Sequence, residues 1–149
     1  MKYVLDSNVA LKWVLAEPDS RIANQLRFDF QNSVSDLITP DVFQVEIAHA
    51  LTRAERLGRI AVSQAGILWA DVMSTPPRLE ASGPLLPKAI QISSAARMGV
   101  YDCLYVALAD REGCQLMTAD DKLIKNLQPR FPFIKHLSSL SALPPPRTP

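Results

Sequence analysis

The order of apolar segments along the chain narrows the choice of fold more than any other property of the sequence. Short segments that read as strands occur at residues 2–5, 37–39, 78–81, 115–118 and 133–136. Between them, apolar residues recur every three or four positions, as they do in amphipathic helices. Strands that alternate with helices indicate an α/β fold with a mainly parallel sheet.

Helices are expected over residues 9–15, 21–30, 41–57, 63–73, 87–98, 101–112 and 120–126. Leu57 and Ile67 are expected to face the core from two of them. The 149 residues fit one domain, which we place at residues 1–142, followed by a flexible proline-rich tail at 143–149.

The composition is that of an ordinary globular domain, with 48% apolar and 21% charged residues. No apolar run reaches the roughly 20 residues of a membrane span, and no signal peptide precedes Asp6, so we expect a cytoplasmic protein without a membrane partner. Cys103 and Cys114 show no metal-binding or redox spacing and are expected to be reduced thiols.

Four acidic residues lie in apolar surroundings, where a buried carboxylate normally costs stability. They are Asp6, Glu46, Asp102 and Asp120. The carboxyl ends of parallel strands meet at one edge of a sheet, which is where sites form. Because Asp6 and Asp120 both show the order strand, Asp, helix, we expect them at that shared edge.

If the four carboxylates converge, each pair about 4 Å apart repels by roughly 4 kcal/mol at an effective dielectric constant of about 20. A divalent cation removes this conflict, and oxygen ligands without His or Cys favour Mg²⁺ or Mn²⁺. Such a site suits phosphodiester hydrolysis. Ser7, Asn8 and Thr118 are expected to order the acids or their waters.

Each acid also has a purely structural alternative. Asp6 and Asp120 are at positions where an Asp caps a helix, and Asp102 is near a helix start, where the helix dipole favours an acid. Glu46 fits neither description and would need a buried ion pair with an Arg.

The net charge of +1 does not by itself indicate binding to nucleic acid. Removing the four acids from 15 acidic residues leaves 11 against 16 basic ones. A modestly basic exterior around an acidic pocket suits a polyanionic substrate.

Four sequence blocks resemble the PIN-domain nucleases, and in particular the VapC-type toxins of toxin–antitoxin pairs. They are VLDSNVALKW around Asp6, PDVFQVE ending at Glu46, YDCLYVALA around Asp102 and LMTADDKL around Asp120. The blocks follow the family order across roughly residues 3–137.

The resemblance implies a three-layer α/β/α fold and an endoribonuclease that depends on Mg²⁺ or Mn²⁺. It places the four acids at the metal-binding positions of the family, with Asp120 at the most variable of them. It also implies an RNA substrate, a homodimer and a cognate VapB-type antitoxin.

Two other functions have sequence features in common with this site. A phosphohydrolase of the haloacid dehalogenase type needs a second acid two residues after Asp6, where this chain has Asn8. A domain that keeps the PIN shell but only binds RNA or protein stays open. The partner surface is expected on the N-terminal helices, with core packing as the alternative for their apolar residues Leu11, Trp13, Val14, Ile22 and Leu26.

Overall fold

The computed structural model describes residues 1–142, and the predicted tail at 143–149 lies outside the described residues. The strands are β1 (Lys2–Leu5), β2 (Asp36–Pro40), β3 (Arg78–Glu80), β4 (Gln115–Thr118) and β5 (Ile134–His136). Each predicted strand is therefore confirmed to within one residue at either end.

The helices follow the predicted order with one shortened element. They are α1 (Ser7–Leu11), α2 (Ser20–Gln31), α3 (Phe43–Arg56), α4 (Gln64–Met73), α5 (Leu86–Ala96), α6 (Val100–Glu112) and α7 (Asp121–Leu127), with 3-10 turns η1 (Gly83–Leu85) and η2 (Leu137–Ala142). The first helix was predicted to reach residue 15, but it ends at Leu11 and the chain continues in turns. None of the helices in the described part is long and apolar enough to cross a bilayer.

The sheet is parallel throughout and has the strand order β3-β2-β1-β4-β5. The chain starts at the central strand β1 and builds outward through β2 and β3. It then returns to the other side of β1 with β4 and β5. The order in which strands are added to the sheet therefore reverses between β1 and β4.

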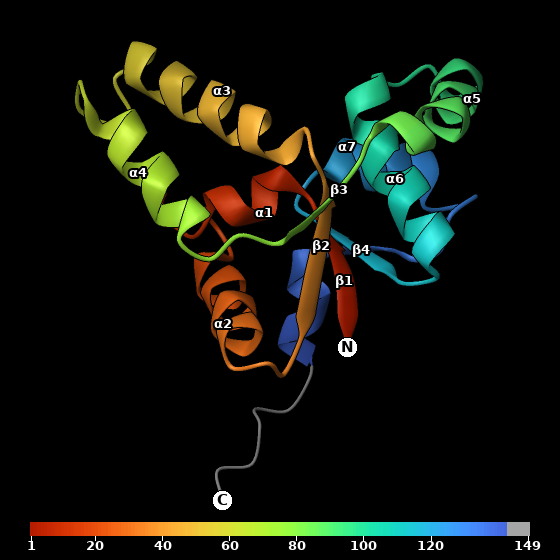
Figure 1. The fold of residues 1–149 in the computed structure, drawn as a ribbon, viewed down its shortest axis with the longest axis horizontal. Coiled ribbons are helices and arrows are strands. Elements are labelled where there is room, and N and C mark those ends of the chain that lie inside the picture. The colour runs from red at the N-terminus through yellow and green to blue at the C-terminus, as the bar shows by residue number, and fades with distance from the viewer. Residues whose placement is uncertain (143–149) are drawn as a thin grey trace, which may run out of the picture.

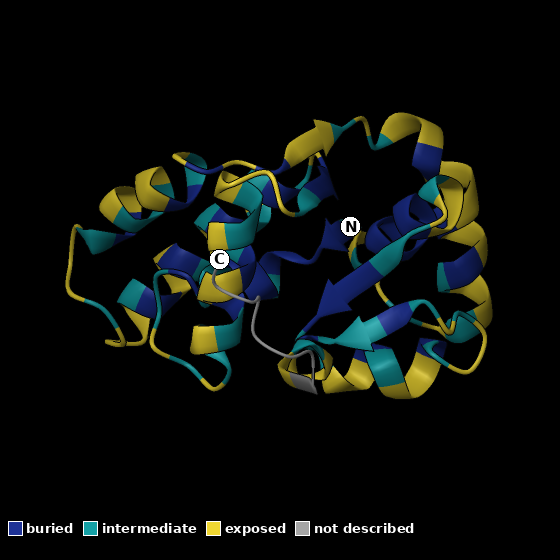
Figure 2. Ribbon diagram, turned by 90° about the horizontal axis from the view of Figure 1, so that it is seen from below, coloured by how far each residue is buried: buried dark blue, intermediate teal, exposed yellow. Residues whose placement is uncertain are grey.

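Helices cover both faces of the sheet, so the predicted α/β/α architecture is confirmed (Figure 1). Val4 and Ile38 face the layer of α5, α6 and α7, whereas Leu5 and Leu37 face α1 to α4. This alternation follows from the two-residue period of a strand. Complete burial of one such side chain stabilises the fold by about 1.5–3 kcal/mol. Figure 2 shows the buried strands between helices that are exposed on their outer sides.

Two of the five apolar side chains expected on the partner surface are buried in the N-terminal part of the fold. Trp13 and Leu26 lie in the core. The Trp13 indole Nε1 donates to the carbonyl oxygen of Ala23 at 2.9 Å, and the Arg27 guanidinium lies 4.8 Å from the ring centre. The other three residues are half-buried against the same core: Leu11, Val14 and Ile22. Core packing is thus the correct alternative for Trp13 and Leu26.

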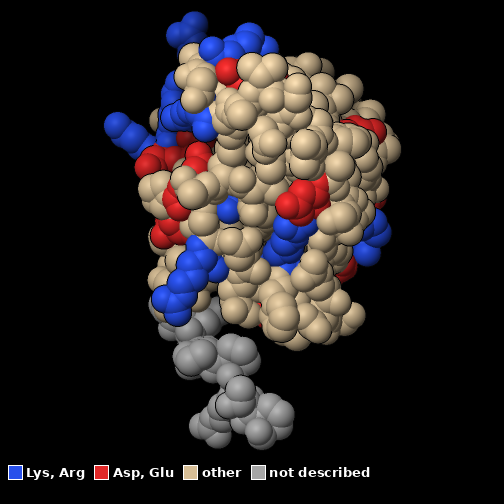
Figure 3. Space-filling view, turned by 90° about the vertical axis from the view of Figure 1, so that its left-hand side faces the viewer, with Lys and Arg blue, Asp and Glu red and all other residues tan. Residues whose placement is uncertain are grey.

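Exposed apolar side chains occur on α3, α4 and the connection between them, and also on α2, where Phe28 is 57% exposed. Leu57 and Ile67, predicted to face the core, are 61% and 62% exposed. Leu57 follows the last turn of α3, and α4 uses Ala65, Leu68 and Val72 for packing. Figure 3 shows that much of this side of the molecule carries no charged side chain.

Candidate functional site

The carboxyl ends of β1 and β4 bring together segments that are more than a hundred residues apart in the sequence. Asp6 directly follows β1, and its backbone N–H donates to the carbonyl oxygen of Met117 in β4 at 3.0 Å. The helices that follow these strands, α1 and α7, leave toward opposite faces of the sheet (Figure 1). The strand order reverses between β1 and β4, and parallel α/β sheets bind their ligands at such a point.

Thr118, at the end of β4, connects the two segments through its buried hydroxyl. The hydroxyl donates to Asp6 Oδ2 at 2.8 Å, and it accepts from Asn8 Nδ2 at 3.4 Å and from the Asp120 backbone N–H at 3.1 Å. Asn8 Oδ1 accepts from the backbone N–H of Ala119 at 3.1 Å. A hydroxyl has one proton and two lone pairs, so Thr118 uses its full hydrogen-bonding capacity.

Asp6 is the most buried of the four acids, with 5% of its surface exposed. Its Oδ1 accepts from Ser7 Oγ and from the backbone N–H of Asn8, both at 3.4 Å, so Asp6 also caps α1. Its pKa is nevertheless raised to about 7, mainly by burial and also by the charges of Glu46 and Asp102, against the lowering effect of its hydrogen bonds.

Glu46 lies in the first turn of α3 and is half-buried. Tyr105 of α6 donates its phenolic hydroxyl to Glu46 Oε1. Burial raises the pKa of Glu46, the bonds from Tyr105 and Ser7 lower it, and the Asp102 charge raises it. Within residues 1–142, no Lys or Arg forms an ion pair with Glu46, so the buried Arg pair considered from the sequence is not present.

Asp102 lies in the first turn of α6, which begins at Val100 and brings the carboxylate toward the same edge. It is half-buried. Burial raises its pKa, the charge of Asp120 raises it further, and Lys122 lowers it. The favourable helix dipole is also present, because the residue lies in the first turn.

Asp120 is the acid least integrated with the others. Its Oδ1 accepts from the backbone N–H groups of Lys122 and Leu123, at 2.9 and 3.2 Å, and so caps α7. Its charge raises the pKa of Asp102, whereas the charges of Glu46 and Asp102 raise the pKa of Asp6, and the charge of Asp102 raises that of Glu46. Asp6 is therefore coupled to both Glu46 and Asp102, whereas Asp120 is coupled to Asp102 and caps α7.

The donor set fits a hard divalent cation by its chemistry. It consists of carboxylate oxygens whose mutual repulsion a cation would relieve, with no Cys or His among them. In the arrangement seen across residues 1–142, no three His, Cys, Asp or Glu side chains are grouped closely enough to hold an ion. Support for an ion therefore comes from the electrostatics of the acids and not from a formed coordination shell.

Tyr105 was not predicted as a site residue, although the sequence contains a signal for it. It is a polar-tipped side chain within a wholly buried run that extends from Cys103 to Ala109. A buried phenolic hydroxyl needs an acceptor, and Tyr105 follows Asp102 by three positions on the same helix face. Both facts point to the edge where the acids lie.

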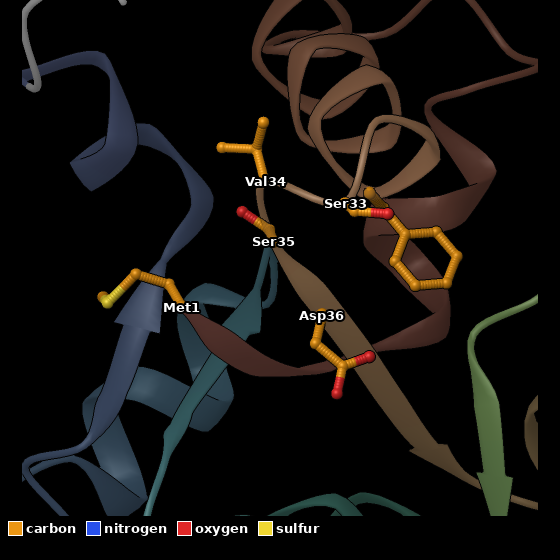
Figure 4. A pocket seen from close by; sticks show the side chains of 6 residues that line it. Met1, Ser33, Val34, Ser35 and Asp36 are labelled. Atoms are coloured by element: carbon orange, nitrogen blue, oxygen red, sulfur yellow. The ribbon is translucent and has the colours of Figure 1, made fainter.

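A hollow of about 320 Å³ lies at the opposite edge of the sheet, near the start of β1 and β2. Figure 4 shows Met1, Val34, Ser35 and Asp36 around it. None of the four predicted acids lines this hollow. The hollow is therefore separate from the chemistry that the acids support.

Comparison with known proteins gives the family. The family model of the PIN domain matches residues 3–127, so the chain belongs to the PIN-domain family. A search of curated protein sequences found no match.

Two solved structures share the fold. PAE2754 from Pyrobaculum aerophilum superposes with a TM-score of 0.70 at 18% identity, covering 94% of this chain and 86% of that one. VapBC2 from Rickettsia felis, bound to a DNA fragment from its promoter, superposes with a TM-score of 0.64 at 16% identity, covering 91% and 98%. PIN domains are typically metal-dependent nucleases.

Proposed function

We propose that this protein is a divalent-metal-dependent endoribonuclease that hydrolyses RNA phosphodiester bonds. One observation carries the proposal. At the point where the strand order reverses, the charges of Glu46 and Asp102 raise the pKa of the buried Asp6, and the charge of Asp102 raises the pKa of Glu46. Three acids held against their mutual repulsion are expected where a cation binds.

In this proposal Asp6, Glu46 and Asp102 bind Mg²⁺ or Mn²⁺, which would lower the pKa of a bound water and stabilise charge on the phosphorus. Thr118 and Asn8 fix Asp6 to the end of β4, and the Ser7 hydroxyl donates to Asp6 Oδ1. Asp120 joins from the margin, where its Oδ1 is already engaged in capping α7.

Basic groups at the rim favour a polyanionic substrate. Lys122 in α7 is close enough to lower the pKa of Asp102, and His49 in α3 acts in the same direction on Glu46. Both side chains are exposed. They can meet phosphate groups on either side of the acids.

We further propose that the protein acts as the toxin of a toxin–antitoxin pair, as a homodimer with a cognate VapB-type antitoxin. The similarity to VapBC2, whose structure contains its promoter DNA, supports this role. The exposed apolar side chains of α3 and α4 are of the kind that a protein partner covers. Light scattering of the purified protein should give a dimer, and a stable monomer would contradict that part of the proposal.

The nuclease proposal is tested by incubating the purified protein with labelled RNA in Mn²⁺, in Mg²⁺ and in excess chelator. Cleavage should require the metal and should be abolished in Asp6→Asn. The control is Asp110→Asn, which changes an exposed Asp at the far end of α6 and should cleave like the wild type. Cleavage in chelator, or full activity of Asp6→Asn, would reject the proposal.

The alternative function is a domain with the PIN fold that binds RNA or protein but has no nuclease activity. No departure from the expected acids favours this alternative, because all four predicted positions carry a carboxylate. RNA binding in a gel-shift assay, combined with no cleavage under any metal, would favour it over the nuclease.

A further inference from the structure

We propose that Tyr105 is a positioning residue, whose hydroxyl holds the Glu46 carboxylate at the metal-binding edge and so sets the affinity of the site for a divalent ion. The inference rests on the proposed metal-dependent function and adds a residue to it. Tyr105 would act through Glu46 and would not contact the ion or the RNA.

The rigidity of Tyr105 is the first argument. The side chain is completely buried in α6, between Leu104 and Val106, which are also buried. A ring packed on all sides cannot turn its hydroxyl elsewhere, so the direction of the donor is set by the core. The hydroxyl donates to Glu46 Oε1.

The position of the bond in the fold is the second argument. Tyr105 belongs to the core between the sheet and α5, α6 and α7, whereas Glu46 is on α3, in the layer on the other face. The bond therefore spans the carboxyl edge of the sheet and links the helix that carries Asp102 to the helix that carries Glu46 (Figure 1).

The electrostatics supply the need for such a bond. Glu46 is half-buried, so its flexible side chain can turn toward water, and the like charges of Asp6 and Asp102 favour that movement. A hydrogen bond from a fixed donor opposes it. A carboxylate can accept about four hydrogen bonds or ligand contacts, so one bond from Tyr105 leaves acceptor sites for an ion.

The test is Tyr105→Phe, which keeps the ring and removes the hydroxyl. Mn²⁺ binding is measured without RNA, from the loss of the free-ion signal in electron paramagnetic resonance. We expect the dissociation constant to rise about 10- to 100-fold, the usual effect of losing a residue that orients a ligand. The matched control is Tyr3→Phe, which removes the hydroxyl of another buried tyrosine, near the start of β1, and should bind Mn²⁺ like the wild type.

A double-mutant cycle separates positioning through Glu46 from a general packing effect. Glu46→Asp keeps the charge but withdraws the carboxylate from Tyr105 by one methylene. In that background Tyr105→Phe should change the dissociation constant by less than about twofold. An equal loss in both backgrounds, or wild-type affinity in Tyr105→Phe, would overturn the proposal.

Failure of the nuclease proposal gives a different result. A wild-type protein that binds Mn²⁺ but cleaves no RNA rejects the nuclease, and the same titration still decides the role of Tyr105. A wild-type protein that binds no Mn²⁺ rejects both. Thermal unfolding of Tyr105→Phe, compared with Tyr3→Phe, shows whether weaker binding reflects loss of the fold.

Discussion

Replacing Asp6 by Asn should stabilise the metal-free protein near neutral pH, although it removes a proposed catalytic group. Asp6 is buried, and its pKa is raised from 3.8 to about 7. Between these values the folded state keeps a proton on Asp6 that the unfolded chain has released. The wild-type protein therefore loses stability as the pH rises from about 4 to about 7, and the loss stays constant above that.

The size of the effect follows from the width of this window. About three pKa units at 1.36 kcal/mol each give an upper value of about 4 kcal/mol. In Asp6, one carboxylate oxygen accepts from Thr118 and the other from Ser7 and the Asn8 backbone N–H. Asn has only one oxygen acceptor, and its NH₂ group cannot accept a hydrogen bond in place of the other. Leaving a buried donor unpaired costs about 1–3 kcal/mol, so we expect a net gain of about 1–3 kcal/mol above pH 7.

Urea unfolding in excess chelator at several values between about pH 4 and pH 8 measures this gain. The advantage of Asp6→Asn should be absent at the acid end, where both proteins are neutral at position 6, and should grow as the pH rises. Asp110→Asn, on the surface, should differ from the wild type by less than about 0.5 kcal/mol at every pH. A pH-independent difference, or a variant less stable than the wild type at pH 8, would refute the assigned charge conflict.

Two further predictions concern the groups that hold the edge together. Thr118→Val should destabilise the protein by about 1–3 kcal/mol in urea unfolding, because Asp6 loses a donor and two donors lose their acceptor. Thr118→Ser, which keeps the hydroxyl, should recover most of that loss, and equal stability of the Ser and Val variants would contradict the hydrogen-bonding role. Asp120→Ala should cost about 1 kcal/mol because α7 loses its cap, whereas Asp120→Asn should be nearly neutral. A large loss in Asp120→Asn would show that its charge, and not capping, stabilises the fold.

The sequence predicted the three central strands β1, β2 and β4 well because each contains a short apolar run. It was less reliable for side chains on amphipathic helices. Leu57 and Ile67 were expected in the core, yet both are exposed, because apolar type alone does not specify which side of a helix faces a neighbour. For Trp13 and Leu26 the error was the opposite: both were expected on a partner surface, yet both are buried. The packing of α2 over the Trp13 ring depends on a turn that the local pattern did not reveal.

The candidate site divides in the same way. The order strand, Asp, helix was sufficient to place Asp6 and Asp120 at one edge, and the structure has both there. The same pattern could not rank them. The structure buries Asp6 among other acids, whereas Asp120 has half its carboxylate committed to backbone N–H groups of α7.

The sequence by itself determined the alternation of strands and helices, the four carboxylates and their positions relative to the strand ends, because these depend on local periodicity and residue type. Only the tertiary structure decided that the strand order reverses between β1 and β4. It also decided that Thr118 forms hydrogen bonds with both Asp6 and Asn8, and that Tyr105 donates to Glu46 across the sheet edge. Such contacts join residues 59 to 112 positions apart. They depend on how helices from opposite faces of the sheet approach one another, and no local pattern in the chain encodes that approach.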